Sequence, residues 1–402
     1  MRKFISWEKS IELLETLKVD RVVSERVPLQ NSLDRILAED IIAKENSPKH
    51  QTSALDGFAI QILDQQSEFI EITENDNPAG ASQIPTLVKG IAIKTFTGSP
   101  MPFGSDTLVP IENVEVLENR LYIRQKVSIG NGVRPVGEVW KRDEIIIEKG
   151  TKISPFEIGI MAELNIVSPK VAVKPKVSIF TTGDEVLLLG EEKTRESQIR
   201  SSNNYTLESL VSKNGGEAIQ LGSVGDSKSE MLETFQNAMK SSDLIVTTGG
   251  VSVGDYDFVR DVVKKLGFEI LFHGVKIKPG QHILVAKKGE KVLLSLPGFA
   301  YSSTITAILY LLPLIRNRLG LEFQNTFTGA VLREDFYKRS KKTEITACNL
   351  YFKDGSISIG FKNKKIGTSA ILRNMLDSPA LLFSNETCGD KKAGEIVRVI
   401  IL

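Results

Sequence analysis

The sequence is poor in the residues that build disulfide scaffolds and zinc clusters. Its 402 residues include two cysteines, Cys348 and Cys388, and three histidines. Two cysteines cannot form a disulfide framework or a four-cysteine metal site, and they fit a reducing compartment. Of the histidines only His273 and His282 lie near each other, so we expect no His-rich zinc site. Any catalysis therefore depends on carboxylates, lysines, hydroxyls and backbone groups.

The sequence also has almost no net charge and no long apolar run. Lys and Arg number 51 and Asp and Glu 50, a net charge of +1 that gives no sign of nucleic-acid or membrane binding. The stretch MRKFISWEKSIELL has no apolar signal-peptide core. The most apolar run, 305–315, contains Pro313 and is shorter than the roughly 20 residues of a membrane-spanning helix. We therefore expect a cytoplasmic protein.

The first half of the chain reads as helical and then β-rich. Residues 1–45 show helical spacing, with a second helix expected at 32–38. In 46–140, closely spaced Gly and Pro separate short apolar runs, which is typical of a small β domain. Residues 141–174 look like a return segment with a helix and a strand.

From about residue 175 the pattern becomes regular. Short buried-type strands alternate with helices up to residue 324, which predicts a mostly parallel α/β sheet. Residues 325–402 return to strand-like alternation. The predicted fold class is multidomain α/β plus β. The predicted domains are 1–45 plus 141–174, 46–140, 175–324 and 325–402.

Three strand ends in the α/β part carry residues suited to ligand binding, because open α/β sheets bind ligands beyond the carboxyl ends of their strands. The first is Thr182-Gly183-Asp184-Glu185, whose carboxylates could hold Mg²⁺. Alternatively, one of these carboxylates only caps the next helix.

The second strand end is the stretch 249–257, Gly-Gly-Val-Ser-Val-Gly-Asp-Tyr-Asp. Its glycines would expose backbone N–H groups as an anion cradle, and its carboxylates add metal-binding capacity. The alternative is a tight glycine turn with a capping Asp. The third is Pro297-Gly298, followed by hydroxyls at 302–304 that could cap the helix or bind phosphate.

Two lysine-containing stretches lie outside these ends. Lys276 and Lys278 stand beside Pro-Gly, which suits an anionic substrate or a solvated turn. Residues 362–365 are most simply a solvated loop. From the residues alone, the pattern indicates a phosphate-bearing ligand, Mg²⁺ and carboxylate chemistry, and it names no reaction.

Five ordered motifs have the pattern of one family: 53–59 (Ser-Ala-Leu-Asp-Gly-Phe-Ala), 98–110, 182–185, 248–257 and 278–280. They resemble those of the molybdopterin molybdenumtransferases, the MoeA type related to the gephyrin E domain. The resemblance implies a molybdopterin-binding α/β domain, a C-terminal β-barrel-like domain, and an elongated homodimer with the active site between protomers. It also allows a molybdopterin adenylyltransferase as a partner.

The same resemblance implies a reaction and a set of residues. Molybdate would be inserted into adenylylated molybdopterin, and AMP released with the help of Mg²⁺. By matching position, Glu185, Asp226 and Asp257 would be the catalytic and Mg²⁺-binding acids, Lys278 would neutralise the oxyanion, and Asp56 would complete the site across the dimer. The other expected ligand-binding residues are Thr182, Gly183, Asp184, Thr248, Gly249, Gly250, Ser252, Gly254, Pro297, Gly298, Ser302 and Ser369.

Several positions depart from the family pattern. Val139 follows Val-Gly-Glu where an Asp is usual, Gly274 stands where a Lys is usual, and Phe299 stands where an Asn follows Pro-Gly. Ser201 replaces an Asp, and the basic strand motif is weak at 344–347. Removing one preorganised group from an electrostatic site can cost about 10²–10³ in rate. We therefore expect either weakened turnover or a site rebuilt with other cations, for which the candidates are Arg134, Arg142 and Lys276.

Our leading hypothesis is a diverged molybdenum insertase. Its rival is a catalytically weakened homologue that binds molybdopterin or a nucleotide as a scaffold or carrier, which the departures favour. An enzyme that shares only the α/β domain conflicts with the motifs around Asp56 and Met101. The sequence does not choose between molybdate and tungstate.

Overall fold

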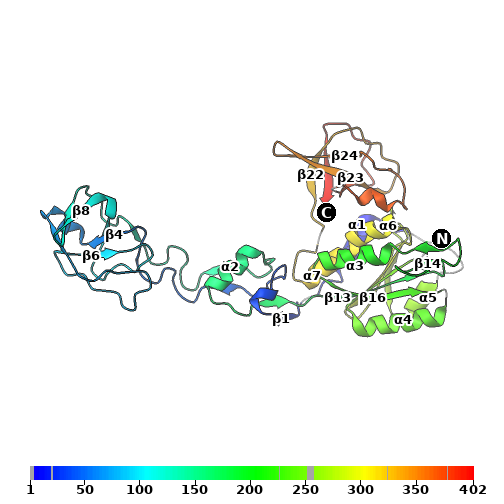
Figure 1. Ribbon diagram of the computed structural model, residues 1–402. Coiled ribbons are helices and arrows are strands. Elements are labelled where there is room, and N and C mark those ends of the chain that lie inside the picture. The colour runs from blue at the N-terminus through cyan, green and yellow to red at the C-terminus, as the bar shows by residue number, and fades with distance from the viewer. Residues whose placement is uncertain (1–3, 20, 226, 251–257, 324, 378) are drawn as a thin grey trace. The chain divides into compact units, whose positions relative to one another are not determined.

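The computed structural model describes residues 4–19, 21–225, 227–250, 258–323, 325–377 and 379–402 (Figure 1). The chain forms two compact units. One comprises Met1–Ala38, Lys152–Ser154 and Ser168–Leu402, and the other comprises Glu39–Thr151 and Pro155–Val167. The predicted division into four domains is finer and stays a prediction.

A six-stranded mixed sheet is the centre of the larger unit. Its strands, in spatial order, are β16 (Glu217–Val224), β13 (Lys176–Thr182), β17 (Leu244–Thr248), β21 (Lys291–Leu296), β20 (Leu284–Lys288) and β18 (Glu269–His273). The first four run parallel, and β20 and β18 add antiparallel pairings at one edge. Because parallel strands need helical crossovers, both faces of this sheet are covered.

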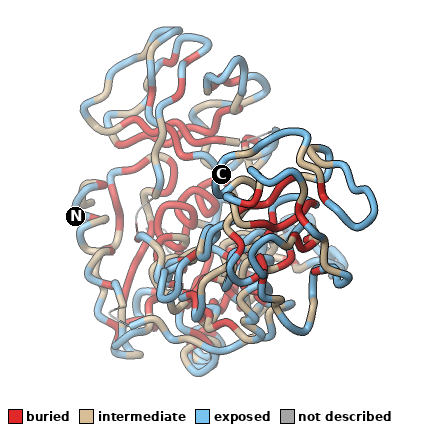
Figure 2. The backbone as a smooth tube through the Cα atoms, turned by 90° about the vertical axis from the view of Figure 1, so that its left-hand side faces the viewer, coloured by how far each residue is buried: buried red, intermediate tan, exposed pale blue. Residues whose placement is uncertain are grey.

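Helices build two separate hydrophobic cores on the two faces of the sheet. One face packs against α1 (Trp7–Glu15), α3 (Asn203–Lys213), α6 (Ala300–Thr306), a π-helical turn at 307–311 and α7 (Leu312–Arg318); the other packs against α4 (Lys228–Ser241) and α5 (Phe258–Lys265). The period of two in a strand explains this division. Leu244 and Val246 of β17 enter the first core and Ile245 the second (Figure 2 shows the buried strands in red).

The C-terminal part closes into a five-stranded barrel. Its strands pair in the order β23 (Thr343–Lys353), β24 (Ser356–Gly360), β22 (Thr328–Leu332), β26 (Ile396–Ile401) and β25 (Pro379–Ser384), and β25 pairs back with β23. The short strand β19 (Ile277–Lys278) pairs in parallel with the start of β23. This pairing places Lys278 against the barrel.

The smaller unit is rich in β-structure. Its largest sheet has the order β7 (Thr107–Pro110), β4 (Gly57–Ile60), β6 (Ile91–Thr95), β5 (Ile70–Ile72), β9 (Arg120–Ile123) and β8 (Val114–Leu117). Two short ladders join β2 (Ile41–Ile42) to β11 (Ile145–Ile147) and β3 (Thr52–Ser53) to β10 (Val133–Arg134). The helix of this unit is α2 (Pro155–Glu163).

The predicted fold class is confirmed: a mostly parallel α/β sheet combines with β-rich parts and a C-terminal barrel. The predicted helix at 32–38 is wrong. Ile36 and Leu37 instead form isolated β-bridges with Lys152 and Val171, so pairing with distant residues overrides the local pattern. Across the part of the chain that the structure describes, no helix has both the length and the apolarity that crossing a bilayer requires.

Candidate functional site

A cleft of about 550 Å³ opens at the carboxyl ends of β13, β17 and β21. The strand register pairs Thr181 with Thr248 and Thr248 with Leu296, so the three strands end at one edge. This is the edge at which the sequence predicted ligand binding. The described residues that line the cleft are Thr181, Thr182, Glu185, Val186, Ile199, Arg200, Ser201, Ser202, Asn203, Thr248, Gly249, Gly250, His282, Pro297, Gly298, Phe299, Ala300 and Ala370.

Two adjacent carboxylates follow β13, and the structure separates them. Glu185 lines the cleft, and its carboxylate folds back over Gly183. Its carbonyl oxygen accepts a hydrogen bond of 2.8 Å from the N–H of Ile199, which begins the short strand β15 (Ile199–Arg200). The Asp184 carboxylate lies against Gly225, after the end of β16. Glu185, rather than Asp184, is therefore the member of this pair that faces the cleft.

Gly249 shows why the chain needs glycine directly after β17. Its φ is +87°, and a Cβ atom there would lie 2.9 Å from both the carbonyl oxygen and Oγ1 of Thr182. Its N–H donates to the carbonyl of Leu296 at 3.1 Å. That N–H is thus bonded to β21 and is not available to an anion, and the predicted cradle beyond Gly250 lies outside the described residues.

Four of the predicted site residues lie outside the described residues: Asp226, Ser252, Gly254 and Asp257. Their roles therefore stay predictions. Within the described ranges, no group of three or more His, Cys, Asp or Glu residues could hold a metal ion. The cleft does offer oxygen donors, namely the Glu185 carboxylate and the Thr182 and Thr248 hydroxyls, and oxygen is the ligand that Mg²⁺ prefers.

The third predicted strand end joins the α/β sheet to the C-terminal part. Pro297 and Gly298 line the cleft, and the Gly298 carbonyl accepts a hydrogen bond of 2.8 Å from Nδ2 of Asn203. Ser302 is buried instead, and both its N–H and its hydroxyl donate to the carbonyl of Ser369 at 3.1 Å. Ser302 and Ser369 therefore meet, although neither lines the cleft.

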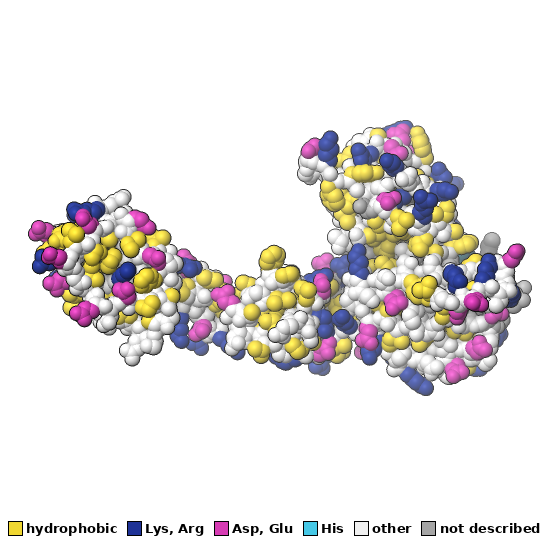
Figure 3. Space-filling model, viewed as in Figure 1, with side chains coloured by type: hydrophobic (Ala, Val, Ile, Leu, Met, Phe, Trp, Pro, Cys, Tyr) yellow, Lys and Arg dark blue, Asp and Glu magenta, His cyan; other side chains and the backbone are white. Residues whose placement is uncertain are grey.

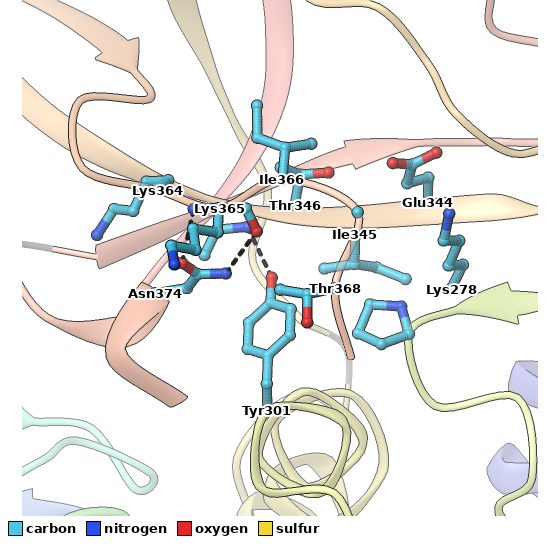
Figure 4. A pocket seen from close by; sticks show the side chains of 13 residues that line it. Lys278, Tyr301, Glu344, Ile345, Thr346, Lys364, Lys365, Ile366, Thr368 and Asn374 are labelled. Carbon is cyan, nitrogen blue, oxygen red and sulfur yellow. Dashed lines mark hydrogen bonds between the residues drawn. The ribbon is translucent and has the colours of Figure 1, made fainter. Parts of the chain in front are cut away.

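Lys278 lines a second, narrow pocket between β19, α6 and the barrel (Figure 4). Its register partner in β23 is Glu344, which is 2% exposed. Figure 4 shows these two side chains at one end of the pocket and those of Lys364 and Lys365 at the other. Tyr301 supports the floor, since its hydroxyl accepts the N–H of Ala347 at 2.8 Å, and burial raises its pKa.

The loop 362–365 is largely solvated, as predicted: Lys362, Asn363 and Lys365 are exposed and Lys364 is half-buried. The sequence did not predict that Lys364 and Lys365 also line the Lys278 pocket. Asn374, which is buried, holds the loop: its Oδ1 accepts the N–H of Lys365 at 2.9 Å, and its Nδ2 donates to the Lys365 carbonyl at 3.0 Å. No local pattern predicts this clamp, because it joins two segments through tertiary packing.

Asp56 belongs to the smaller unit and directly precedes β4. Its Oδ1 accepts hydrogen bonds of 2.8 Å from both the N–H and the hydroxyl of Thr97. These bonds hold the pKa of Asp56 below its ordinary value. The carboxylate is thus ionised and fixed on its own sheet, and its predicted role across a dimer stays a prediction.

The structure explains one departure from the family pattern, at Gly274, and locates two of the cations suggested as replacements. Gly274 has a φ of +99°, and a Cβ atom there would lie 2.1 Å from the ring of Phe4, so a lysine cannot stand in this backbone. Lys276, the suggested replacement, is exposed, and among the described residues it lines neither pocket. Arg134 is in the smaller unit and pairs with Glu138 at 2.5 Å.

Two protein-family models match the chain. The model described as "MoeA N-terminal region (domain I and II)" matches residues 5–165. The model described as "Probable molybdopterin binding domain" matches residues 178–317. Together they cover nearly all of the smaller unit and of the sheet that carries the cleft.

Curated relatives and solved structures extend the likeness along the chain. A molybdopterin molybdenumtransferase of Nostoc sp. is 31% identical over 343 residues, which are 83% of this chain and 78% of that protein. One from Bacillus subtilis is 28% identical over 397 residues, 94% of this chain and 90% of that protein. The crystal structure of a molybdopterin biosynthesis MoeA protein from Pyrococcus horikoshii matches 100% of both chains with a TM-score of 0.82 at 26% identity.

Restoring a lysine at position 274 is expected to damage the fold. We expect Gly274→Lys to lower the free energy of unfolding by about 1–3 kcal/mol, because the backbone at position 274 is left-handed, which strains a lysine, and because its Cβ would collide with Phe4. Thermal unfolding of the full chain measures this. Gly389→Lys is the matched control, since nothing lies within 4 Å of its Cβ position. Equal melting temperatures for the two variants would contradict the steric account.

Proposed function

Because the chain belongs to the molybdopterin molybdenumtransferase family and so to molybdenum cofactor biosynthesis, we propose that it inserts molybdate into adenylylated molybdopterin and releases AMP with the help of Mg²⁺. The observation that carries this proposal is the pair of adjoining pockets in the larger unit. One is a roomy cleft at the carboxyl ends of three parallel strands, and the other is a narrow pocket that contains Lys278.

The large cleft suits the nucleotide-linked substrate. The hydroxyls of Thr181, Thr182 and Thr248 lie at its floor. Each already donates within the sheet: Thr181 and Thr182 to the Thr248 carbonyl at 3.4 Å, and Thr248 to Oγ1 of Thr181 at 3.1 Å. They therefore offer oxygen lone pairs to a bound cation rather than hydrogen bonds to phosphate oxygens. The rest of the lining is mixed: Val186, Ile199 and Phe299 are apolar, whereas Arg200, Ser202 and His282 are polar. Apolar surface with a few polar groups is typical of sites for small ligands.

The Lys278 pocket has the charge for an oxyanion, and its volume of about 10 Å³ has room for about one water, so the lining side chains must move apart before an oxyanion enters. An ammonium group neutralises anionic charge, and the hydroxyls of Thr346 and Thr368 line the same pocket as donors. Lys364 and Lys365 add positive charge at its far end. The lining thus includes three lysines and one carboxylate, that of Glu344. The ammonium of Lys364 donates to the Leu376 carbonyl, so Lys278 is the lysine paired in register with Glu344 and proposed to meet the anion.

The cleft and the Lys278 pocket lie on either side of the contact between α6 and the segment around Ser369. Ala300 lines the cleft and Tyr301 lines the Lys278 pocket, while in the barrel Ala370 lines the cleft and Thr368 the pocket. The bonds between Ser302 and Ser369 hold these two segments together. A ligand in the cleft and an oxyanion beside Lys278 would therefore be neighbours, which insertion requires.

Glu185 is the described residue that would hold Mg²⁺ in the cleft, with Asp226 and Asp257 as the further predicted ligands. When bound, the ion would supply positive charge at the phosphate as AMP leaves. Glu185 is positioned for this by the turn that returns the chain over Gly183 toward β15.

The weakened homologue that only binds its ligand keeps one specific observation in its favour. Glu344 places a buried carboxylate beside Lys278, where the oxyanion is proposed to bind. Position 274 has no lysine to offset it. A pocket with a carboxylate and fewer cations binds an oxyanion less tightly, which would slow the insertion of molybdate. Both functions include binding of molybdopterin or a nucleotide, so molybdate-dependent turnover is the property that distinguishes them.

A turnover assay tests the reaction. Full-length protein is incubated with adenylylated molybdopterin, Mg²⁺ and molybdate, and the release of AMP is followed. We expect molybdate-dependent release, and about 10²–10³-fold slower release by Glu185→Gln, since an acid of the Mg²⁺ site is lost. The control is Glu196→Gln, because Glu196 is an exposed acid that lies, like Glu185, between β13 and α3. Substrate binding without molybdate-dependent release of AMP would establish the weakened homologue instead.

The charge of the Lys278 pocket has its own test. Lys278→Ala is expected to raise the molybdate concentration needed for half-maximal turnover at least tenfold, whereas Lys276→Ala, two residues away and outside both pockets, leaves it unchanged. Glu344→Gln is expected to lower that concentration, because it removes the competing negative charge. Equal effects of Lys278→Ala and Lys276→Ala would rule out this pocket as the oxyanion site.

We also propose that the chain forms a homodimer. In helix α2, all of whose residues are described, Met161 is the one buried side chain, and Ile158 and Ile160 are half-buried. Val167, just beyond it, is 73% exposed. Figure 3 shows hydrophobic side chains (yellow) on the visible face of the region around α2. Exposed apolar surface of this kind marks interfaces between protein chains.

Sedimentation of the wild-type chain is expected to give the mass of a dimer, and Val167→Asp is expected to shift it toward the monomer. Val331→Asp, at an exposed valine of the barrel, is the matched control. A wild-type chain that stays monomeric at every concentration would refute the proposal.

A further inference from the structure

Two large apolar side chains stand exposed in the cleft. Phe299, which precedes α6, is 62% exposed, and Ile199 of β15 is 60% exposed. Both line the cleft whose floor is polar. Apolar side chains in contact with water gain free energy when a ligand covers them, so these two surfaces favour an apolar or aromatic part of a ligand.

Phe299 serves neither the helix nor the core. It occupies the N-cap position of α6, where Ser, Thr, Asn and Asp are preferred, and its side chain makes no capping hydrogen bond. It also lies outside the hydrophobic cores on both faces of the sheet. A phenylalanine at this position therefore provides no capping hydrogen bond to α6, and its side chain is not buried in the folded chain.

The backbone on either side of Phe299 is fixed. The carbonyl before it, that of Gly298, accepts a hydrogen bond of 2.8 Å from Asn203, and its own carbonyl accepts one of 2.9 Å from the N–H of Ser303. The backbone that carries the ring is thus fixed at the cleft, which reduces the conformational entropy lost when a ligand packs on the ring.

We propose that Phe299 is a ring-stacking residue, which binds the planar, nitrogen-containing double ring of the ligand, with Ile199 as a second apolar contact. The inference rests on the proposed function, since adenine and pterin are the two rings that an adenylylated molybdopterin would bring. Aromatic faces stack on such rings in offset arrangements, independent of hydrogen-bond pattern.

The test measures binding of two probes, AMP and 6-hydroxymethylpterin, to the full-length chain. Phe299→Ala is expected to weaken binding of one probe by roughly tenfold to a hundredfold. Phe299→Trp is expected to restore it and to show quenching of the indole fluorescence on binding, a signal that a purely structural role would not produce. The probe that loses affinity identifies which ring stacks.

Phe352→Ala is the matched control, because Phe352 is 71% exposed on the barrel and outside both pockets. If Phe299→Ala binds both probes as the wild type does, the stacking role is overturned, and release of AMP by the wild type leaves the proposed function standing. If the wild type binds neither probe and releases no AMP, both fall together.

Discussion

The parallel alignment of β13, β17 and β21 is the constraint on which the site depends. Their register ends all three strands at one level, with Thr181, Thr248 and Leu296 side by side. The ladder of hydrogen bonds between these parallel strands ends there, and open α/β sheets bind ligands just beyond the carboxyl ends of their strands. Glycine at 249 is needed because the backbone passes so close to Thr182 that no side chain fits. The same alignment that buries the strands therefore creates the cleft.

The C-terminal barrel contributes a second constraint. A short pairing of β19 with β23 and the contact of Ser302 with Ser369 fix the barrel against the edge of the sheet that holds the cleft. The Lys278 pocket exists only because these two parts meet. An oxyanion bound there would be held by residues from both, which couples the fold of the barrel to the chemistry of the sheet.

Much of the fold could be predicted from the sequence, because short apolar runs separated by helical patterns define a buried parallel sheet. The strand ends that carry Glu185, Gly249 and Gly298 could be located for the same reason. The bridges of Ile36 and Leu37 could not, since their partners lie more than a hundred residues away in the chain.

The parts of the site that escaped prediction depend on tertiary packing. Lys364 lines a pocket because Asn374 clamps its loop, and position 274 excludes a lysine because Phe4 occupies the space. Neither fact has a signature in a single sequence. The position of Asp184 against Gly225, away from the cleft, likewise follows from how β13 and β16 end together.

The central claim is that two neighbouring pockets bind the two substrates of one reaction, the nucleotide-linked ligand in the cleft and the oxyanion beside Lys278. A crystal of the full-length chain with AMP and tungstate, a heavy analogue of molybdate, tests it most directly through anomalous scattering. The account predicts a tungsten peak beside Lys278 and the AMP phosphate at the ends of β13 and β17. A tungsten peak away from Lys278, or AMP outside the cleft, would contradict it.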